Sequence, residues 1–199
     1  MTNKRCFLMT AYCNTPEKQE ALKNTIINIK KYNIDIILFS HYPIKEDIQP
    51  LVRYSIYDYS NPISNIKDKS MINWKKLNKF RKKTIPFKLN TLAVDYGYAA
   101  AQQFKRGLLF ANQLDYDEVI VLNYDLEVTD KMLKDFDDNL INYDNIILKY
   151  GNDDASMYMA WFALKLKPFI KNIKSINYTD YVKTEVIVEN YLFQKFNSV

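Results

Sequence analysis

Polar and acidic side chains follow a short apolar run in the middle of the chain. The run is Glu118-Val-Ile-Val-Leu122, and Asn123, Asp125 and Glu127 come directly after it. Side chains two residues apart on an extended segment project from the same side, so these three are expected to point together. Carboxylates at this spacing suit Mg²⁺ or Mn²⁺, which prefer oxygen ligands and bridge protein carboxylates to substrate phosphates. The pattern predicts a cation site; the alternative interpretation is a solvated end of a strand.

A helix and a strand are predicted to position these side chains. Apolar residues recur at spacings of three and four from Ala100 to Leu114, which predicts an amphipathic helix. Gly107 lies on its apolar face, where it allows close packing on a sheet. The run at 118–122 is β-branched and apolar, as in a strand that is covered on both faces of a parallel sheet. In open α/β sheets ligands bind at the carboxyl ends of the strands, where Asn123 is expected to lie.

The first forty residues predict a strand, a helix and a second strand. Arg5 to Tyr12 and Ile34 to Phe39 are typical of buried strands, and the helix between them begins at Pro16. A right-handed crossover makes the two strands parallel. Further patterns predict a short helix at 45–51, strands at 53–57, 145–150 and 156–164, and helices at 130–140 and 179–196.

Length and composition are those of one ordinary domain. The chain has 199 residues, of which 48% are hydrophobic and 26% are charged, which excludes a disordered or fibrous class. The N-terminus leads directly into a strand-like segment, and no apolar run is long enough to span a bilayer. We therefore expect a soluble, cytoplasmic protein. Cys6 and Cys13 lack the spacing of a metal site and are expected to be reduced thiols.

Several common enzyme classes are excluded because their motifs are missing. The sequence has no Walker-type phosphate loop, no G-x-G-x-x-G, no G-x-S-x-G and no Cys or His cluster. In contrast, Gly97, Ala99-Ala100, Gln103, Gly107 and Ala111 precede an apolar strand that ends in x-x-Asp. This arrangement resembles the core of nucleotide-sugar glycosyltransferases of the GT-A fold, of the family 2 type. The resemblance covers about Phe7 to Asp130.

In that family the strand ends in a D-x-D motif, whose last acid holds Mn²⁺ or Mg²⁺ against the donor diphosphate. The present chain has an N-x-D variant, because Asn123 stands where the first Asp is expected. Asp125-Leu126-Glu127 offers a D-x-E pair that begins two residues later. The resemblance therefore assigns the metal to Asp125, assisted by Asn123 or Glu127. The amide keeps an oxygen ligand but removes one negative charge.

The resemblance also implies a fold. It is an α/β, single-domain, Rossmann-like GT-A sheet that is mostly parallel, with helices on both faces. The domain spans residues 1–199, with a nucleotide-binding part at about 1–130 and an acceptor-side part at about 131–199. The implied activity moves a sugar from a nucleoside-diphosphate-sugar donor to a glycan or another hydroxyl acceptor, with Mn²⁺ or Mg²⁺.

Further site residues are carried over by position. The nucleoside is expected at Thr10, Ala11, Tyr12 and Asp58, and Asn123 and Tyr124 are expected to contribute to binding of the nucleotide-sugar donor. Tyr12 can stack on a base, and Asp58 can accept a hydrogen bond from a base or ribose. A catalytic base is expected at Asp153 or Asp154, with Glu185 as a further candidate; the alternative for each aspartate is an acid in a turn.

Two other functions remain open. The first is a non-catalytic nucleotide- or sugar-binding module on the same sheet, which Asn123 favours. The second is a nucleic-acid or anionic-surface adaptor that uses the basic segment 74–83. That segment also fits a solvated helix face or a diphosphate contact, and the lack of a second basic cluster argues against a dedicated nucleic-acid protein.

Overall fold

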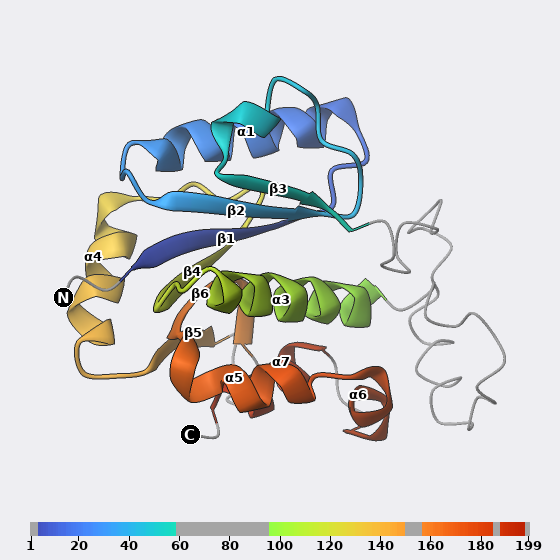
Figure 1. Cartoon of the computed structure of the whole chain (residues 1–199), viewed down its shortest axis with the longest axis vertical. Helices are drawn as coiled ribbons and strands as arrows, with labels where there is room; N and C mark the ends of the chain where they lie inside the picture. The colour runs from blue at the N-terminus through green and yellow to red at the C-terminus, as the bar shows by residue number, and fades with distance from the viewer. Residues whose placement is uncertain (1–3, 59–95, 150–156, 185–187, 198–199) are drawn as a thin grey trace, which may run out of the picture.

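The computed structural model describes residues 4–58, 96–149, 157–184 and 188–197. Within these ranges the chain forms a six-stranded sheet in the order β3-β2-β1-β4-β6-β5 (Figure 1). The strands are β1 (Arg5–Ala11), β2 (Asp35–Ser40), β3 (Tyr54–Tyr57), β4 (Glu118–Asn123), β5 (Asn145–Lys149) and β6 (Met157–Lys165). The β3, β2, β1 and β4 strands are parallel, whereas β6 runs antiparallel to both β4 and β5.

Helices cover both faces of the sheet. They are α1 (Pro16–Lys30), α3 (Tyr96–Gln113), α4 (Asp130–Leu140), α5 (Leu166–Ser175), α6 (Tyr178–Thr184), α7 (Val188–Phe196) and the 3-10 helix η1 (Gln49–Leu51). The Thr15 hydroxyl caps α1 by accepting from the Lys18 backbone N–H, with Pro16 at the first position. The Thr129 hydroxyl caps α4 in the same way.

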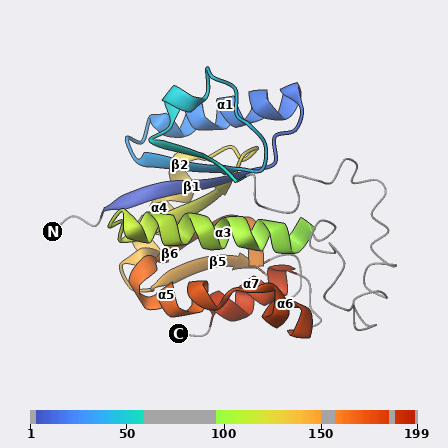
Figure 2. The same cartoon turned by 45° about the vertical axis from the view of Figure 1, so that its right-hand side comes forward.

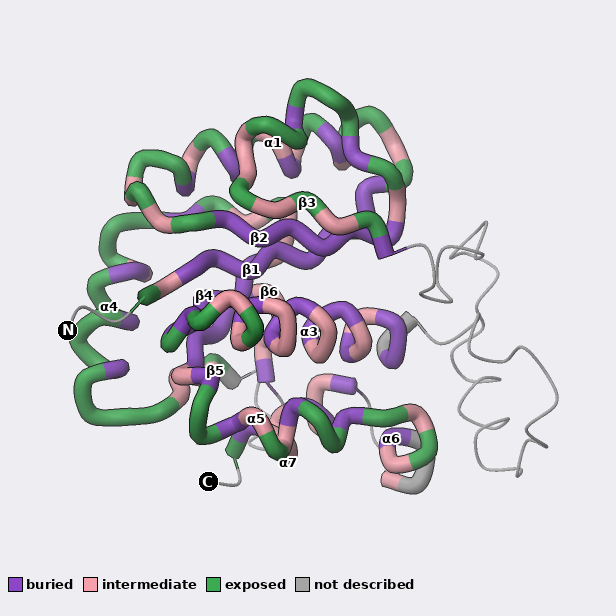
Figure 3. The backbone as a smooth tube through the Cα atoms, in the orientation of Figure 1, coloured by how far each residue is buried: buried purple, intermediate pink, exposed green. Residues whose placement is uncertain are grey.

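Side chains on the two faces of the central strands pack into two separate hydrophobic cores. In β1, Cys6 and Leu8 face a core that contains α3, α5 and α7, whereas Phe7 and Met9 face a core that contains α1 and α4. This division follows from the alternation of side chains along a strand. Figure 3 shows β1 and β2 buried along most of their lengths, and Figure 2 shows α3 lying along the sheet.

Close contact between α3 and β1 depends on Gly107. A Cβ atom at this position would lie 2.6 Å from Leu8 Cδ1, and the Leu8 side chain is fully buried. Since the leucine is packed on all sides, a larger residue would force overpacking of the core. The prediction that Gly107 serves close packing on the sheet is confirmed.

The α/β class, the mostly parallel sheet and the helices on both faces are confirmed. Several local predictions are wrong. Residues 45–51 contain only η1, and two helices, α6 and α7, stand where the sequence predicts one over 179–196. Helix α5 was not predicted; Pro168 lies in its first turn, where a missing N–H costs little.

Candidate functional site

The carboxyl ends of β1 and β4 lie side by side. Thr10 of β1 is opposite Asn123 of β4 in the parallel register, and His41, after β2, donates its backbone N–H to the Ala11 carbonyl at 3.0 Å. The predicted site residues of the first and fourth strands therefore meet at one edge of the sheet. In open α/β sheets this is the edge at which ligands bind.

Asn123 and Asp125 contact each other directly at this edge. The Nδ2 atom of Asn123 donates to Oδ1 of Asp125 at 2.7 Å. The expectation that Asn123, Asp125 and Glu127 project from one extended segment is wrong, because β4 ends at Asn123 and the chain turns at 124–125. Asp125 is exposed and reaches back to Asn123 by way of the turn. The pair is therefore brought together by the turn and not by strand alternation.

Beyond the turn, the chain crosses to the face of the sheet that α1 and α4 cover. Tyr124 packs against the core on that face, and the Val128 backbone N–H donates to Oδ1 of Asn28 in α1 at 3.2 Å. The hydroxyl of Tyr32 donates to Oδ1 of Asp130 at 2.7 Å, which holds the start of α4. Glu127 is an exposed residue of this loop.

A cavity of about 200 Å³ opens on the other side of Asn123, on the face of the sheet that α3 and α7 cover. Its described lining residues come from five elements that are distant in sequence. They are Thr10, Ala100, Phe104, Asn123, Tyr158, Met159, Ala160 and Glu189. Thr10 and Asn123 were predicted as site residues.

Sequence reasoning missed Tyr158 and Glu189 as site residues. Tyr158 is at the start of β6, and its place beside β4 depends on the antiparallel pairing of these two strands. Glu189 is in the first turn of α7, which packs on β6 and α3. The sequence identifies Glu189 as an acid on a predicted helix. No local pattern predicts that it lies near the carboxyl end of β4.

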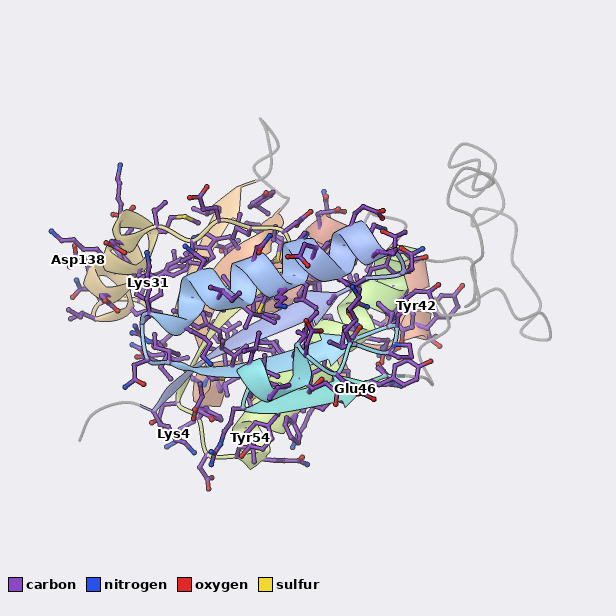
Figure 4. The ribbon with its side chains drawn as sticks, turned by 90° about the horizontal axis from the view of Figure 1, so that it is seen from above. Lys4, Lys31, Tyr42, Glu46, Tyr54 and Asp138 are labelled. Atoms are coloured by element: carbon purple, nitrogen blue, oxygen red, sulfur yellow. The ribbon has the colours of Figure 1, made fainter. Side chains whose placement is uncertain are left out.

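The side chain of Tyr12 is held in an aromatic group at the same edge. Its ring centroid lies 5.3 Å from that of Tyr42 and 6.0 Å from that of His41, both with edge-on geometry. The Lys18 ammonium lies 4.8 Å from the Tyr12 ring centroid. Tyr12 is only 5% exposed, so most of its ring is already covered. Figure 4 shows Tyr42 at one end of the molecule and Lys4, Lys31 and Asp138 toward the other.

Asp58 is the buried acid at the carboxyl end of β3. Its carboxylate forms an ion pair with the guanidinium of Arg106 in α3, and its backbone N–H donates to the Ser40 carbonyl at 2.8 Å. The Asp58 side chain is 6% exposed, whereas that of Arg106 is 39% exposed. The ion pair therefore ties the end of β3 to the middle of α3.

Both cysteines are buried thiols, and they are not disulfide-bonded. Burial raises the pKa of Cys13 to about 12; the charge of Lys18 opposes this shift, and the charge of Asp125 adds to it. Burial also raises the pKa of Cys6. The influence of Asp125 on Cys13 is a second sign that the ends of β1 and β4 meet.

Some predicted residues lie outside the described ranges. These are the candidate bases Asp153, Asp154 and Glu185 and the basic segment 74–83. Among the described residues, no group of three or more His, Cys, Asp and Glu side chains is arranged to hold a metal ion. In the same ranges, no helix combines the length and apolar character that crossing a membrane requires.

Comparison with known proteins shows a distant likeness in structure and none in sequence. No protein-family model matches the sequence, and no curated protein sequence matches it. Among solved structures, the chain is similar to core-mannan synthase A from Aspergillus fumigatus in its Mn/GDP form, with 11% sequence identity and a TM-score of 0.43. The match covers 96% of this chain but 64% of that one. A likeness this distant assigns neither activity nor ligand to the present chain.

Proposed function

We propose that the chain is a metal-assisted glycosyltransferase of the GT-A type. It would move a sugar from a nucleoside-diphosphate-sugar donor to a glycan or another hydroxyl acceptor. The observation that supports this proposal most is the contact between Asn123 and Asp125 at the shared carboxyl edge of β1 and β4, beside a cavity. This arrangement agrees with the N-x-D motif and with its expected place at the end of a strand.

The residues at this edge fit a divalent cation that is bound mainly by substrate and water. Mg²⁺ and Mn²⁺ commonly use one or two protein carboxylates, and phosphate oxygens and water complete the shell. Asp125 is exposed and supplies such a carboxylate. Asn123 now presents its amide nitrogen to Asp125, so it would have to turn its oxygen toward the ion to become a ligand. Glu127 remains a candidate third ligand. The bound cation would neutralise the charge that develops on the leaving diphosphate.

The remaining candidate site residues would have the roles that the family resemblance suggests. Thr10, Ala11 and Tyr12 would contact the nucleoside from the end of β1, and Tyr124 would contribute from the turn after β4. Asp58 would accept a hydrogen bond from the base or ribose while Arg106 holds its carboxylate in place. Asp153, Asp154 and Glu185 are the candidates for the base that takes the proton of the acceptor hydroxyl.

A non-catalytic nucleotide- or sugar-binding module is the second candidate function. The amide of Asn123 favours it, because the site has one negative charge fewer than a D-x-D pair. The transferase requires nucleotide binding that depends on a divalent cation, and a nucleotide-binding module on the same sheet would share that binding. They differ in whether the donor is turned over. Hydrolysis of a nucleotide sugar that Mn²⁺ stimulates would support the transferase, and binding without hydrolysis would support the module.

The test is a thermal-shift panel of nucleoside diphosphates and nucleotide sugars, each with Mn²⁺ and with chelator. A ligand that binds only the folded state raises the melting temperature, and the stabilisation grows with the logarithm of ligand concentration over Kd. We expect at least one nucleotide to stabilise the native chain with Mn²⁺, and this shift to disappear in Asp125→Ala. The matched control is Asp138→Ala, an exposed aspartate in α4 toward the other end of the molecule (Figure 4). If no nucleotide gives a shift that depends on the metal, the proposal is wrong.

A further inference from the structure

The described lining of the cavity beside Asn123 is acidic, which is unusual for a site that would bind the phosphates of a nucleotide. Glu189 is the one ionisable acid among its described lining residues, and no Lys, Arg or His is among them. Among these described residues, a diphosphate would therefore meet a like charge and no cationic side chain. The phosphates are better placed on the Asp125 side of Asn123, where a divalent ion can hold them.

The volume of the cavity limits what can enter. At about 30 Å³ per water, about 200 Å³ corresponds to roughly seven water molecules. Pockets for larger organic ligands begin at roughly 300 Å³. This volume is enough for one ring-sized group, and a larger donor would have to extend beyond the cavity.

The walls of the cavity have two characters. Phe104 and Met159 supply apolar surface, and the Phe104 ring is fixed against Phe162 with centroids 5.7 Å apart. Thr10, Asn123 and Glu189 supply hydroxyl, amide and carboxylate groups. A sugar ring has the matching pattern, because its C–H faces are apolar and its hydroxyls donate and accept hydrogen bonds. An uncharged sugar can therefore pack on the apolar wall and form hydrogen bonds with the polar wall.

We infer that this cavity holds the sugar ring of the donor and that Glu189 selects an uncharged sugar over a uronic acid. The inference rests on the proposed function, since it assigns one part of the same donor. Glu189 has no hydrogen-bond or ion-pair partner among the described residues, so its carboxylate can accept from sugar hydroxyls. Hydrogen bonds to an ionised acceptor are about twice as strong as neutral ones. A sugar carboxylate in the same cavity would offer no donor and would be repelled.

Asn123 joins the two parts of the site. It contacts Asp125 on the side proposed for the metal and also lines the cavity. The bond between sugar and diphosphate would thus lie beside Asn123, with the ring toward Glu189 and the phosphates toward Asp125. Glu189 is a specificity residue in this arrangement and not a catalytic base.

The experiment compares matched neutral and anionic donors. The nucleobase of both donors is the one that the thermal-shift panel favours. The neutral and anionic donors compared are UDP-glucose and UDP-glucuronate, or GDP-mannose and GDP-mannuronate. Calorimetry with Mn²⁺ gives the Kd of each donor for the native chain, for Glu189→Gln and for the control Glu20→Gln, an exposed acid on α1. Glutamine keeps the size of the side chain and removes its charge, and thermal melting reports whether the variant is folded.

We expect the native chain to bind the neutral donor at least about tenfold more tightly than the uronate, a difference of about 1.4 kcal/mol. Glu189→Gln should reduce this ratio to about threefold or less, mainly because the uronate binds more tightly, and Glu20→Gln should leave it unchanged. An equal affinity for both donors in the native chain would overturn the inference, as would a ratio that survives in folded Glu189→Gln. In either case metal-dependent binding of UDP or GDP would leave the proposed function standing. Absence of any such binding would remove both.

Discussion

The amide nitrogen of Asn123 lies 2.7 Å from Oδ1 of Asp125, across the turn that ends β4. This contact pairs a donor with a carboxylate, so a hydrogen bond within the chain stabilises the turn. A second carboxylate at position 123 would give two like charges in the same place. The residue at this position therefore sets how strongly the turn depends on a metal ion.

The first prediction concerns Asn123→Asp. With chelator, the variant should be less stable than the native chain by about 1 kcal/mol, because a hydrogen bond to a charged group is replaced by like-charge repulsion. With Mn²⁺ and the preferred nucleotide, the second carboxylate should strengthen cation binding, so the variant should gain more in melting temperature than the native chain. Thermal melting under the two conditions measures both effects.

The control for this prediction is Asn139→Asp, an exposed position in α4. Its melting temperature should change by the same amount with Mn²⁺ and with chelator. If Asn123→Asp responds to Mn²⁺ no more than the native chain does, the metal is not bound at this turn.

The parallel core of the fold was predictable from the sequence, because its signals are local. Apolar runs identify β1, β2 and β4, and the Thr15-Pro16 cap identifies the start of α1. The connection between β1 and β2 then fixes their relative direction. Thr10, Asn123 and Asp125 could be placed at one edge for the same reason.

The rest of the site could not be predicted, because it depends on contacts between distant segments. Nothing within residues 157–165 specifies that β6 runs antiparallel to β4, yet this direction places Tyr158 at the cavity. Glu189 reaches the cavity only because α7 packs on β6 and α3. The turn after β4 was also mispredicted, since a strand pattern cannot show where the strand stops.

The second prediction concerns the ion pair between the buried Asp58 and the partly exposed Arg106. Arg106→Met should destabilise the chain by about 2–3 kcal/mol, because it removes a charged hydrogen-bond partner from a buried carboxylate. Asp58→Asn should also destabilise it. The double variant should lose at least about 1 kcal/mol less than the sum of the single losses, as expected for residues in direct contact.

Urea unfolding of the four proteins measures this cycle. Losses that add within about 0.5 kcal/mol would show that the two side chains act independently. The same proteins also test the proposed role of Asp58 in nucleoside binding. If Asp58 contacts the nucleoside, Asp58→Asn should lose more nucleotide-dependent stabilisation than Arg106→Met, although both lose folding stability.

The third prediction concerns the pH dependence of stability, through Cys13. Burial raises the pKa of this thiol from an ordinary value of 9.0 to about 12. Between pH 8 and pH 10 the unfolded chain therefore releases the thiol proton while the folded chain keeps it. Because the folded state then binds more protons, the free energy of unfolding falls as the pH rises, by about 1.4 kcal/mol for this group over that interval. The loss continues until the pH reaches the folded pKa.

Urea unfolding of the native chain and of Cys13→Ala at pH 8 and pH 10 isolates this contribution. The variant starts from a lower stability, because it loses a buried sulfur, but it lacks the thiol that titrates. Other groups, including Cys6, titrate in both proteins and cancel in the comparison. The native chain should therefore lose about 1.4 kcal/mol more than Cys13→Ala between the two pH values. An equal loss in both proteins would mean that Cys13 ionises in the folded chain as readily as in the unfolded one, which contradicts its burial beside Asp125.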